Sequence, residues 1–391
     1  DSIQVFDRNK KHIKKKEVIF TWDVTDAEKS GFPHFMLKEI YDQPETVHHV
    51  LRGRISEMEE KITFPDPVEK LLKAEINSIH IVACGTSFYA GFVGKYLIEQ
   101  LTNIPVFVEP ASEYRYFGSR NETSLIIAIT QSGETADTLA ALREARLSGS
   151  KTLVITNIIG STATRIADGY ILQQSGPEIG GAATKTFTSQ IIVLFLLALK
   201  IAIYQKKLGS NELYNYLLHL KYLPRHVRDV LERSDEINAV AHHLKDATSV
   251  FFIGRGINYP LSLEGALKLK EISYIHAEGF AAGELKHGPF ALLTKDTPVV
   301  AIVTQDETYE KILANIGEIK ARGSPVIAFA EDKDTEIENH ADYVLRFPTS
   351  PHLLPCIPIT VVLQLLAYHV ADLRKCPIDK PRNLAKSVTV E

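Results

Sequence analysis

The stretch Leu125-Ile-Ile-Ala-Ile-Thr-Gln-Ser-Gly-Glu-Thr135 decides the fold. It begins as an apolar, β-branched run typical of a buried strand, continues through polar turn residues, and leads into a helical pattern near Ala136. Strand, turn and helix in this order are the unit of a parallel α/β sheet. Further strand candidates are His80–Ala83, Val106–Val108, Thr152–Thr156, Tyr170–Gln173, Val250–Ile253, Val299–Val303, Val326–Ala330 and Tyr343–Phe347. The sequence therefore predicts α/β structure.

The second group of strands repeats the first, after a charged helical connector at about 206–245. The quoted stretch aligns with a segment that begins at Val299 and ends at Thr308. Thr130 and Thr304 are 174 residues apart, and so are Gly149 and Gly323. An equal offset at two separate places indicates duplication of one α/β unit. We expect two similar domains.

Composition points to a globular protein in a reducing compartment. Of the 391 residues, 45% are hydrophobic and 24% charged, and the net charge of −4 argues against a nucleic-acid-binding surface. Three cysteines without zinc-type spacing favour the cytoplasm. The longest apolar run, Ile191–Leu199, is too short for a bilayer span of about twenty residues. We interpret it as a buried helix.

The region before the first strand is expected to be a lead-in that packs on the first domain. The residues up to about 33 are polar, with a possible strand at Val18–Trp22. A helical pattern then runs from His34 to Pro44, and a second helix is expected from Pro44 to Ile62. The chain opens on Asp1 rather than Met and shows no signal peptide. We therefore interpret it as a fragment or a processed product.

Two turns at the ends of predicted strands are suited to a polar ligand. In the turn from Thr130 to Thr135, hydroxyls and the free amides of a helix start could bind a phosphate monoester, although Ser132 could instead only cap the helix. The second half has Asp306 where the first has Ser132 and Gly133, and a carboxylate would repel phosphate. The other turn, Ala83-Cys-Gly-Thr-Ser87, allows close backbone approach at its glycine. Open α/β sheets bind ligands at such strand ends.

Three other segments carry ionisable side chains. Glu264, Lys268 and Glu271 share one helix face, either as a surface ion-pair ladder or as a buried pair in which a glutamate acts as a general base. His287, in a glycine-bounded loop, could be an acid or base or could be structural. Lys386 in the tail could be solvated or, if the tail packs down, a nucleophile. Gly254-Arg-Gly256 lacks the third glycine of a dinucleotide-binding turn.

Several strings together resemble the glutamine–fructose-6-phosphate amidotransferase family. They are Cys84–Ser87, Gln131–Leu139, Glu178–Gly180, Glu264–Glu278, Gly283–Pro289 and Leu384–Glu391, and the likeness begins at His34. The resemblance implies two sugar isomerase (SIS) domains, each a five-stranded parallel sheet flanked by helices in a flavodoxin-like three-layer sandwich. We expect a lead-in at 1–65, the domains at 66–215 and 216–380, and a tail at 381–391.

The same resemblance implies the chemistry, the amination and isomerisation of fructose 6-phosphate to glucosamine 6-phosphate in hexosamine biosynthesis. Lys386 corresponds to the Schiff-base lysine and Glu271 to the base between C1 and C2, with Lys268 beside it. His287 corresponds to the ring-opening residue, supplied by the neighbouring subunit of a homodimer. The residues that correspond to sugar-phosphate contacts are Cys84, Gly85, Thr86, Ser87, Thr130, Gln131, Ser132, Thr135, Ala183 and Ala385.

The chain departs from the family pattern at two places. The family commonly reads Glu-Ile-Gly-Val-Ala-Ser-Thr-Lys where this chain has Gly181 and Ala183, so a sugar-binding hydroxyl is missing. The amino-terminal glutaminase domain is also missing, so glutamine hydrolysis is not expected. No metal or cofactor is required, and no nucleic-acid or membrane partner is expected. The alternatives are an amino-sugar-phosphate deaminase or deglycase, and a non-catalytic SIS sensor of sugar phosphates.

Overall fold

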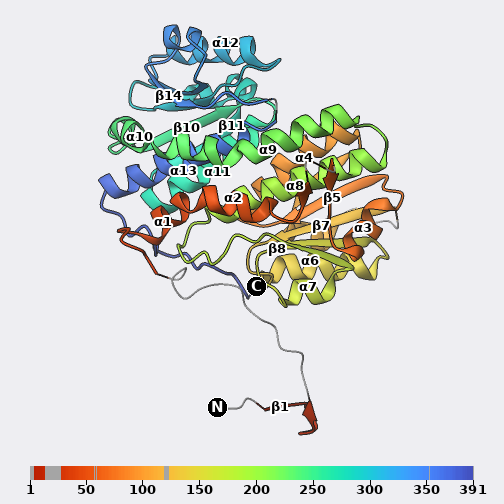
Figure 1. The fold of residues 1–391 in the computed structure, drawn as a ribbon. Helices are drawn as coiled ribbons and strands as arrows, with labels where there is room; N and C mark the ends of the chain where they lie inside the picture. Colours follow the sequence, from red (N-terminus) through yellow and green to blue (C-terminus); the bar gives the residue numbers. More distant parts are fainter. Residues whose placement is uncertain are drawn as a thin grey trace.

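Two parallel sheets lie on either side of a shared layer of helices in the computed structural model, which describes residues 4–13, 28–56, 58, 60–118, 123–351 and 353–390 (Figure 1). The first sheet has the order β6-β5-β7-β8-β9 and the second β11-β10-β12-β13-β14. Both orders are 2-1-3-4-5 in chain sequence, the flavodoxin-like arrangement. The prediction of two similar five-stranded α/β units is confirmed.

The strands are short and mostly buried, as their apolar runs predict. Those of the first sheet are β5 (Ser78–Ala83), β6 (Val106–Pro110), β7 (Ser124–Thr130), β8 (Lys151–Thr156) and β9 (Gly169–Leu172). Those of the second are β10 (Ser249–Gly254), β11 (His276–Ala281), β12 (Val299–Ile302), β13 (Val326–Glu331) and β14 (Tyr343–Phe347). Pairing is parallel throughout both sheets. All carboxyl ends of one sheet therefore meet at one edge.

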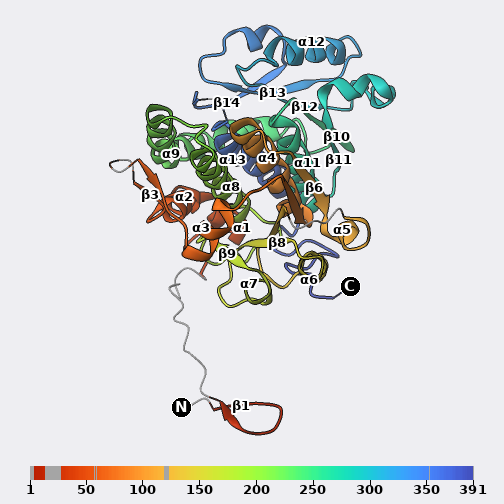
Figure 2. The same ribbon diagram turned by 90° about the vertical axis from the view of Figure 1, so that its right-hand side faces the viewer.

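The helices between the sheets form a core common to both halves (Figures 1 and 2). They are α4 (Gly85–Thr102), α8 (Lys185–Tyr204), α9 (Ser210–Leu231), α10 (Ser234–Ala241), α11 (Asn258–Ser273) and α13 (Cys356–Leu373). The outer faces are covered by α5 (Ala111–Phe117), α6 (Ala136–Leu147) and α7 (Thr162–Ile166) on the first sheet, and by α12 (Tyr309–Lys320) with short 3-10 helices η2 (Ala282–His287), η3 (Pro289–Leu292) and η4 (Glu336–Asn339) on the second. Because α4 packs against α11, the two halves meet directly.

In the described part of the chain, two helices are apolar and long enough to cross a membrane by length and composition alone. They are α8 and α13, and 94% and 83% of their most apolar windows are buried inside the protein. The expectation of a buried helix around Ile191–Leu199 is confirmed, and both are core helices.

The second helix of the lead-in is shorter than expected, and a hairpin follows it where the rest of the helix was predicted. The first helix is α1 (Phe35–Tyr41), but the second, α2 (Gln43–Leu51), ends well before Ile62. Gly53 has φ +73° and directs the chain into an antiparallel pair, β3 (Ile55–Ser56) with β4 (Lys61–Ile62). The expectation of a helix to Ile62 is wrong because this glycine and the β-branched residues after it favour a turn and strands.

The remaining elements are α3 (Asp66–Lys73) and a short antiparallel pair, β1 (Val5–Phe6) and β2 (His12–Ile13). The possible strand at Val18–Trp22 lies outside the described residues. Of the strands in the two large sheets, β11 was not predicted, and its sequence His-Ala-Glu-Gly-Phe-Ala has no apolar run. It is a half-exposed edge strand, so little apolar surface marks it in the sequence.

Candidate active site

The two predicted ligand turns lie side by side because they follow neighbouring strands. β5 pairs with β7, and the turns at their carboxyl ends open α4 and α6. This is the point where the strand order reverses, at which flavodoxin-like sheets bind ligands. The predicted phosphate turn and the turn around Gly85 therefore share one edge of the first sheet.

The predicted phosphate turn, residues 130–135 (hereafter the phosphate turn), is stabilised by its own hydroxyls. Thr130 Oγ1 lies 2.9 Å from Thr135 Oγ1 and accepts a 3.2 Å hydrogen bond from Gly133 N, while Ser132 Oγ accepts one of 3.1 Å from Glu134 N. Gly133 has φ +69°, and a Cβ there would lie 2.1 Å from Ser161 Oγ. The helix cap position of α6 is Thr135, which makes no side-chain cap bond. The alternative that Ser132 caps α6 is therefore wrong.

The turn from Cys84 to Ser87 connects three helices. Cys84 Sγ lies 3.8 Å from Thr138 Oγ1 on α6, and Ser87 Oγ accepts a 3.0 Å hydrogen bond from Gln190 Nε2 on α8. Thr86 Oγ1 donates to Glu264 Oε1 on α11 at 3.3 Å. The contact between Thr86 and Glu264 joins the ligand edge of the first half to the charged helix of the second.

The charged face of α11 is buried, so the surface-ladder alternative is wrong for Glu264 and Lys268. The Lys268 side chain is 0% exposed, and its Nζ lies 2.5 Å from Glu271 Oε2 and 3.6 Å from Glu264 Oε1. Burial raises the pKa of Glu264 to about 8 although Lys268 opposes this. Burial alone would lower the pKa of Lys268, but Glu264, Glu271 and, more weakly, Glu178 raise it. Glu271, at 21% exposed, is the accessible carboxylate beside a buried ammonium.

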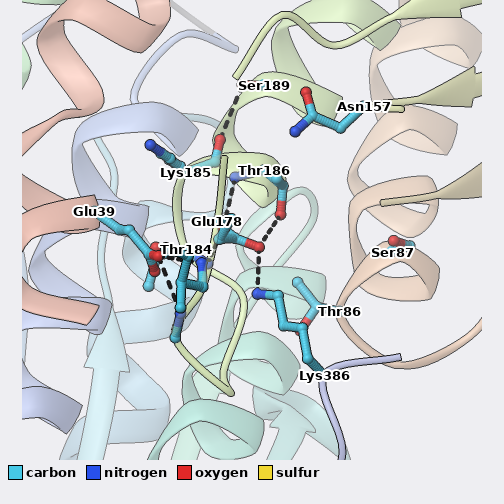
Figure 3. Close-up of polar contacts among 12 residues, drawn as sticks. Glu39, Thr86, Ser87, Asn157, Glu178, Thr184, Lys185, Thr186, Ser189 and Lys386 are labelled. Atoms are coloured by element: carbon cyan, nitrogen blue, oxygen red, sulfur yellow. Dashed lines mark hydrogen bonds and ion pairs between the residues drawn. The ribbon is translucent and has the colours of Figure 1, made fainter. Parts of the chain in front are cut away.

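The carboxyl-terminal tail packs down, and Lys386 meets a buried carboxylate that was not among our predicted site residues. Lys386 Nζ lies 2.7 Å from Glu178 Oε2 (Figure 3). The Glu178 carboxylate also accepts hydrogen bonds from Thr184 N at 2.9 Å, Thr186 N at 3.1 Å and Thr186 Oγ1 at 2.9 Å. Burial would raise the pKa of Glu178, but the Lys386 ammonium and these N–H donors outweigh it and lower the pKa. Glu178 is therefore an ionised carboxylate that orients the amine.

The tail also reaches the phosphate turn. Ser387 Oγ donates to Ser132 Oγ at 3.1 Å, and Ala136 N, at the start of α6, donates to Val388 O at 3.1 Å. Arg382 N donates to Tyr274 Oη, directly after α11, at 2.9 Å. The tail thus connects the charged helix, the Glu178 carboxylate and the phosphate turn.

The remaining predicted residues lie on the same segments, with one exception. Gln131 contributes its backbone carbonyl to Asn157 N, Ala183 is half-buried beside Thr184, and Ala385 is exposed on the tail. His287 is exposed at the end of η2 in the second half, next to α12. Among the described residues, no hydrogen bond or ion pair joins His287 to the tail or the phosphate turn. A metal-binding group of His, Cys, Asp and Glu is likewise not found among the residues that the structure describes.

Comparison with known proteins agrees with this geometry. The SIS domain family matches residues 71–200 and 243–373. A solved structure described as the C-terminal domain of glucosamine-fructose-6-phosphate aminotransferase from Francisella tularensis is 38% identical, with a TM-score of 0.86, and covers 90% of this chain and 100% of that one. The chain belongs to this family of two-SIS isomerase regions.

A curated relative supports the same assignment. The glutamine–fructose-6-phosphate aminotransferase (isomerizing) of Methanosarcina acetivorans is 52% identical over 100% of this chain and 63% of its own length. The two-SIS chain thus spans about 63% of that relative. A glucosamine-6-phosphate deaminase from Thermotoga maritima, at 23% identity and a TM-score of 0.72, covers 90% of this chain and 99% of its own, and shows the shared fold alone.

Proposed function

We propose that this chain is the isomerase half of a glucosamine-6-phosphate synthase. It binds fructose 6-phosphate, accepts ammonia, and forms glucosamine 6-phosphate for hexosamine biosynthesis. The observation that carries the proposal is the position of the tail, which brings Lys386 to Glu178 and Ser387 to Ser132. A nucleophilic amine and a phosphate-binding turn then belong to one site.

The substrate is held by its phosphate at the turn from Thr130 to Thr135 and by the turn from Cys84 to Ser87. Hydroxyls, together with the amides at the start of α6, supply donors for the phosphate oxygens. Val388 O accepts from Ala136 N at this place, so the tail must yield that amide for phosphate to use it. Gly181 lies against the tail, where a Cβ would be 2.7 Å from Pro381 Cδ, and Ala183 offers the sugar no hydroxyl.

The chemistry follows from two pairs of ionisable groups. Lys386, after giving up its proton, attacks the ketose carbonyl, and water leaves as the Schiff base forms; ammonia then displaces the lysine. Glu271 removes a proton from C1 and returns it at C2, which converts the ketose skeleton to the aldose. Lys268, whose Nζ lies 2.5 Å from Glu271 Oε2, holds that carboxylate in place for the transfer. His287 of the neighbouring subunit assists ring opening in a homodimer.

We also propose a cytoplasmic location. Cys84, Cys356 and Cys376 are free thiols, in keeping with a reducing compartment. The apolar helices α8 and α13 are core helices, with 94% and 83% of their most apolar windows buried.

Lysine trapping tests the proposal. Purified chain should isomerise fructose 6-phosphate to glucose 6-phosphate without a nitrogen donor, and form glucosamine 6-phosphate with free ammonia. Borohydride reduction in the presence of fructose 6-phosphate should leave an adduct on Lys386, and Lys386→Arg should abolish it because guanidinium does not condense. Labelling of another lysine, or turnover only from glucosamine 6-phosphate, would contradict the proposal.

A further inference from the structure

Helix α1 of the lead-in packs against the segment that presents Glu178, outside both sheets. Glu39, in the middle of this helix, is 2% exposed. Its Oε1 accepts hydrogen bonds from Ile179 N at 2.5 Å and Gly180 N at 3.0 Å (Figure 3). These are the two residues that follow Glu178, so one carboxylate fixes the backbone on which the partner of Lys386 depends.

The close approach between Glu39 and this backbone depends on Gly180. A Cβ at Gly180 would lie 2.9 Å from Glu39 Oε2 and 3.4 Å from Met36 Cα. The segment is therefore seated directly on α1, without a side chain between them. A shift of α1 or loss of its carboxylate would release the backbone next to Glu178.

The start of α1 contacts the beginning of the tail as well. Asp379 accepts hydrogen bonds from Phe35 N at 3.0 Å and Met36 N at 3.1 Å through its two carboxylate oxygens. Its backbone carbonyl accepts from Gly181 N at 3.0 Å. Helix α1 thus contacts two segments, residues 178–184 and the tail. These two segments bring Glu178 and Lys386 together.

The environment of Glu39 suits a structural acceptor rather than a counter-ion. Burial and the nearby Glu178 carboxylate raise the pKa of Glu39 to about 7, although Lys386 opposes this. No described residue donates a hydrogen bond to Oε2, while Oε1 makes both backbone contacts. A carboxyl oxygen accepts such bonds in either protonation state. Holding the two backbone amides therefore depends on the length of the Glu39 side chain more than on its charge.

We propose that Glu39 is a positioning residue for the tail lysine: by holding the amides of Ile179 and Gly180 it keeps Glu178 where it pairs with Lys386. The inference rests on the proposed function, in which Lys386 is the nucleophile. It also gives α1 a positioning role in addition to its packing against the first half.

Two conservative variants separate the effect of side-chain length at position 39 from the effect of its charge. Glu39→Gln keeps an acceptor oxygen at the same reach, and Glu39→Asp keeps the charge but withdraws the carboxylate by about 1.5 Å, one bond length. We expect Glu39→Gln to retain kcat and borohydride trapping at Lys386 within about threefold. Glu39→Asp should lower both by about tenfold to a hundredfold, the usual cost of misplacing a reacting group by about 1 Å.

The Michaelis constant provides the second readout. The phosphate turn lies on a different element, so the KM for fructose 6-phosphate should stay within about twofold in both variants, as expected when only transition-state positioning is lost. Glu45→Asp, an equally short change at an exposed glutamate on α2, is the matched control and should behave as the unaltered chain.

The outcomes are distinct. Retained kcat and trapping in Glu39→Asp, or an equal loss in Glu39→Gln, would overturn the inference while leaving the proposed function intact. A parallel rise in KM and fall in melting temperature, without the contrast between the two variants, would show a role in folding only and also overturn it. An unaltered chain without isomerisation or trapping would overturn the proposed function itself.

Discussion

Gly133 and Asp306 lie in corresponding turns of the two halves, and they differ in the room that they leave for a phosphate. Gly133 allows its turn to approach Ser161 closely, because a Cβ at this position would lie only 2.1 Å from Ser161 Oγ. This turn presents hydroxyls. Asp306 fills its own turn: its carboxylate accepts from Thr308 N at 2.7 Å and from the hydroxyls of Thr304 and Thr308, each at 2.6 Å. Negative charge therefore occupies the place where phosphate would bind.

This asymmetry predicts that one substitution changes the KM for fructose 6-phosphate and the corresponding one in the second half does not. Ser132→Ala should raise the KM for fructose 6-phosphate by about tenfold or more, because a hydrogen bond to a charged group contributes about 1.5–3 kcal/mol. Asp306→Ala should leave this KM near that of the unaltered chain and lower only stability. Steady-state isomerisation kinetics on both variants check the prediction. Equal changes in KM would show that the turns are equivalent.

At the residue scale, the sequence predicts the type of group better than its surroundings. The spacing of Glu264, Lys268 and Glu271 predicts one helix face, but only the packing of α11 against α4 and α13 decides that Lys268 is fully buried. Glu178 was visible only inside a family string. Its contact with Lys386 joins residues 208 positions apart, and local patterns carry no information about such a pair.

At the scale of elements, helix α11 and strand β11 fit together at a glycine. A Cβ on Gly279 would lie 2.7 Å from Leu263 Cα and 2.8 Å from Ser262 O, both backbone atoms that cannot turn aside. The helix that carries Glu271 can therefore lie close against the edge strand. At Gly317 on α12, by contrast, no described atom outside its own stretch of helix lies within 4 Å of a would-be Cβ.

Alanine at these two glycines should change stability in opposite directions. Gly279→Ala should destabilise the protein by about 1–3 kcal/mol, because α11 must move to admit the methyl group. Gly317→Ala should stabilise it by about 0.5–1 kcal/mol, since alanine loses less backbone entropy in a helix interior. Urea unfolding, compared by midpoint and slope, measures both. Destabilisation by both variants would mean that the close approach at Gly279 is not the cause.

The elements that sequence patterns predict well are those with an apolar period. All nine expected strands are present, because buried parallel strands are short apolar runs. The hairpin β3–β4 and the edge strand β11 were missed, since their residues are polar or half-exposed and their pairing is decided by neighbours. The boundary of α2 depends on the positive φ of Gly53, a conformation that a helical pattern does not reveal.

At the scale of the whole molecule, the two halves share one hydrophobic core. The principal hydrophobic cluster includes Ile81 of β5, Leu194 of α8, Leu269 of α11 and Phe329 of β13. The duplication and the fold could be predicted from the sequence. The joining of the halves through Thr86 and Glu264 could not, because it depends on how α4 and α11 cross.

His287 is the predicted site residue that the fold leaves apart. It is exposed on η2, beside α12 on the outer face of the second sheet, whereas Lys386 and Ser132 lie at the edge of the first. If His287 takes part in ring opening, the chain must receive it from a second copy. An active site would then form only in a dimer, with Glu271 from one subunit and His287 from the other.

Complementation between two inactive variants tests this arrangement. In a mixed dimer of His287→Ala and Glu271→Gln, one site carries both defects and the other keeps both residues. After dissociation and random reassociation about half of the dimers are mixed, each with one of two sites intact, so activity should recover to about a quarter of that of the unaltered chain. Isomerase assays after verified subunit exchange measure it. No recovery would place His287 in the site of its own subunit, because each mixed dimer would then contain two singly defective sites.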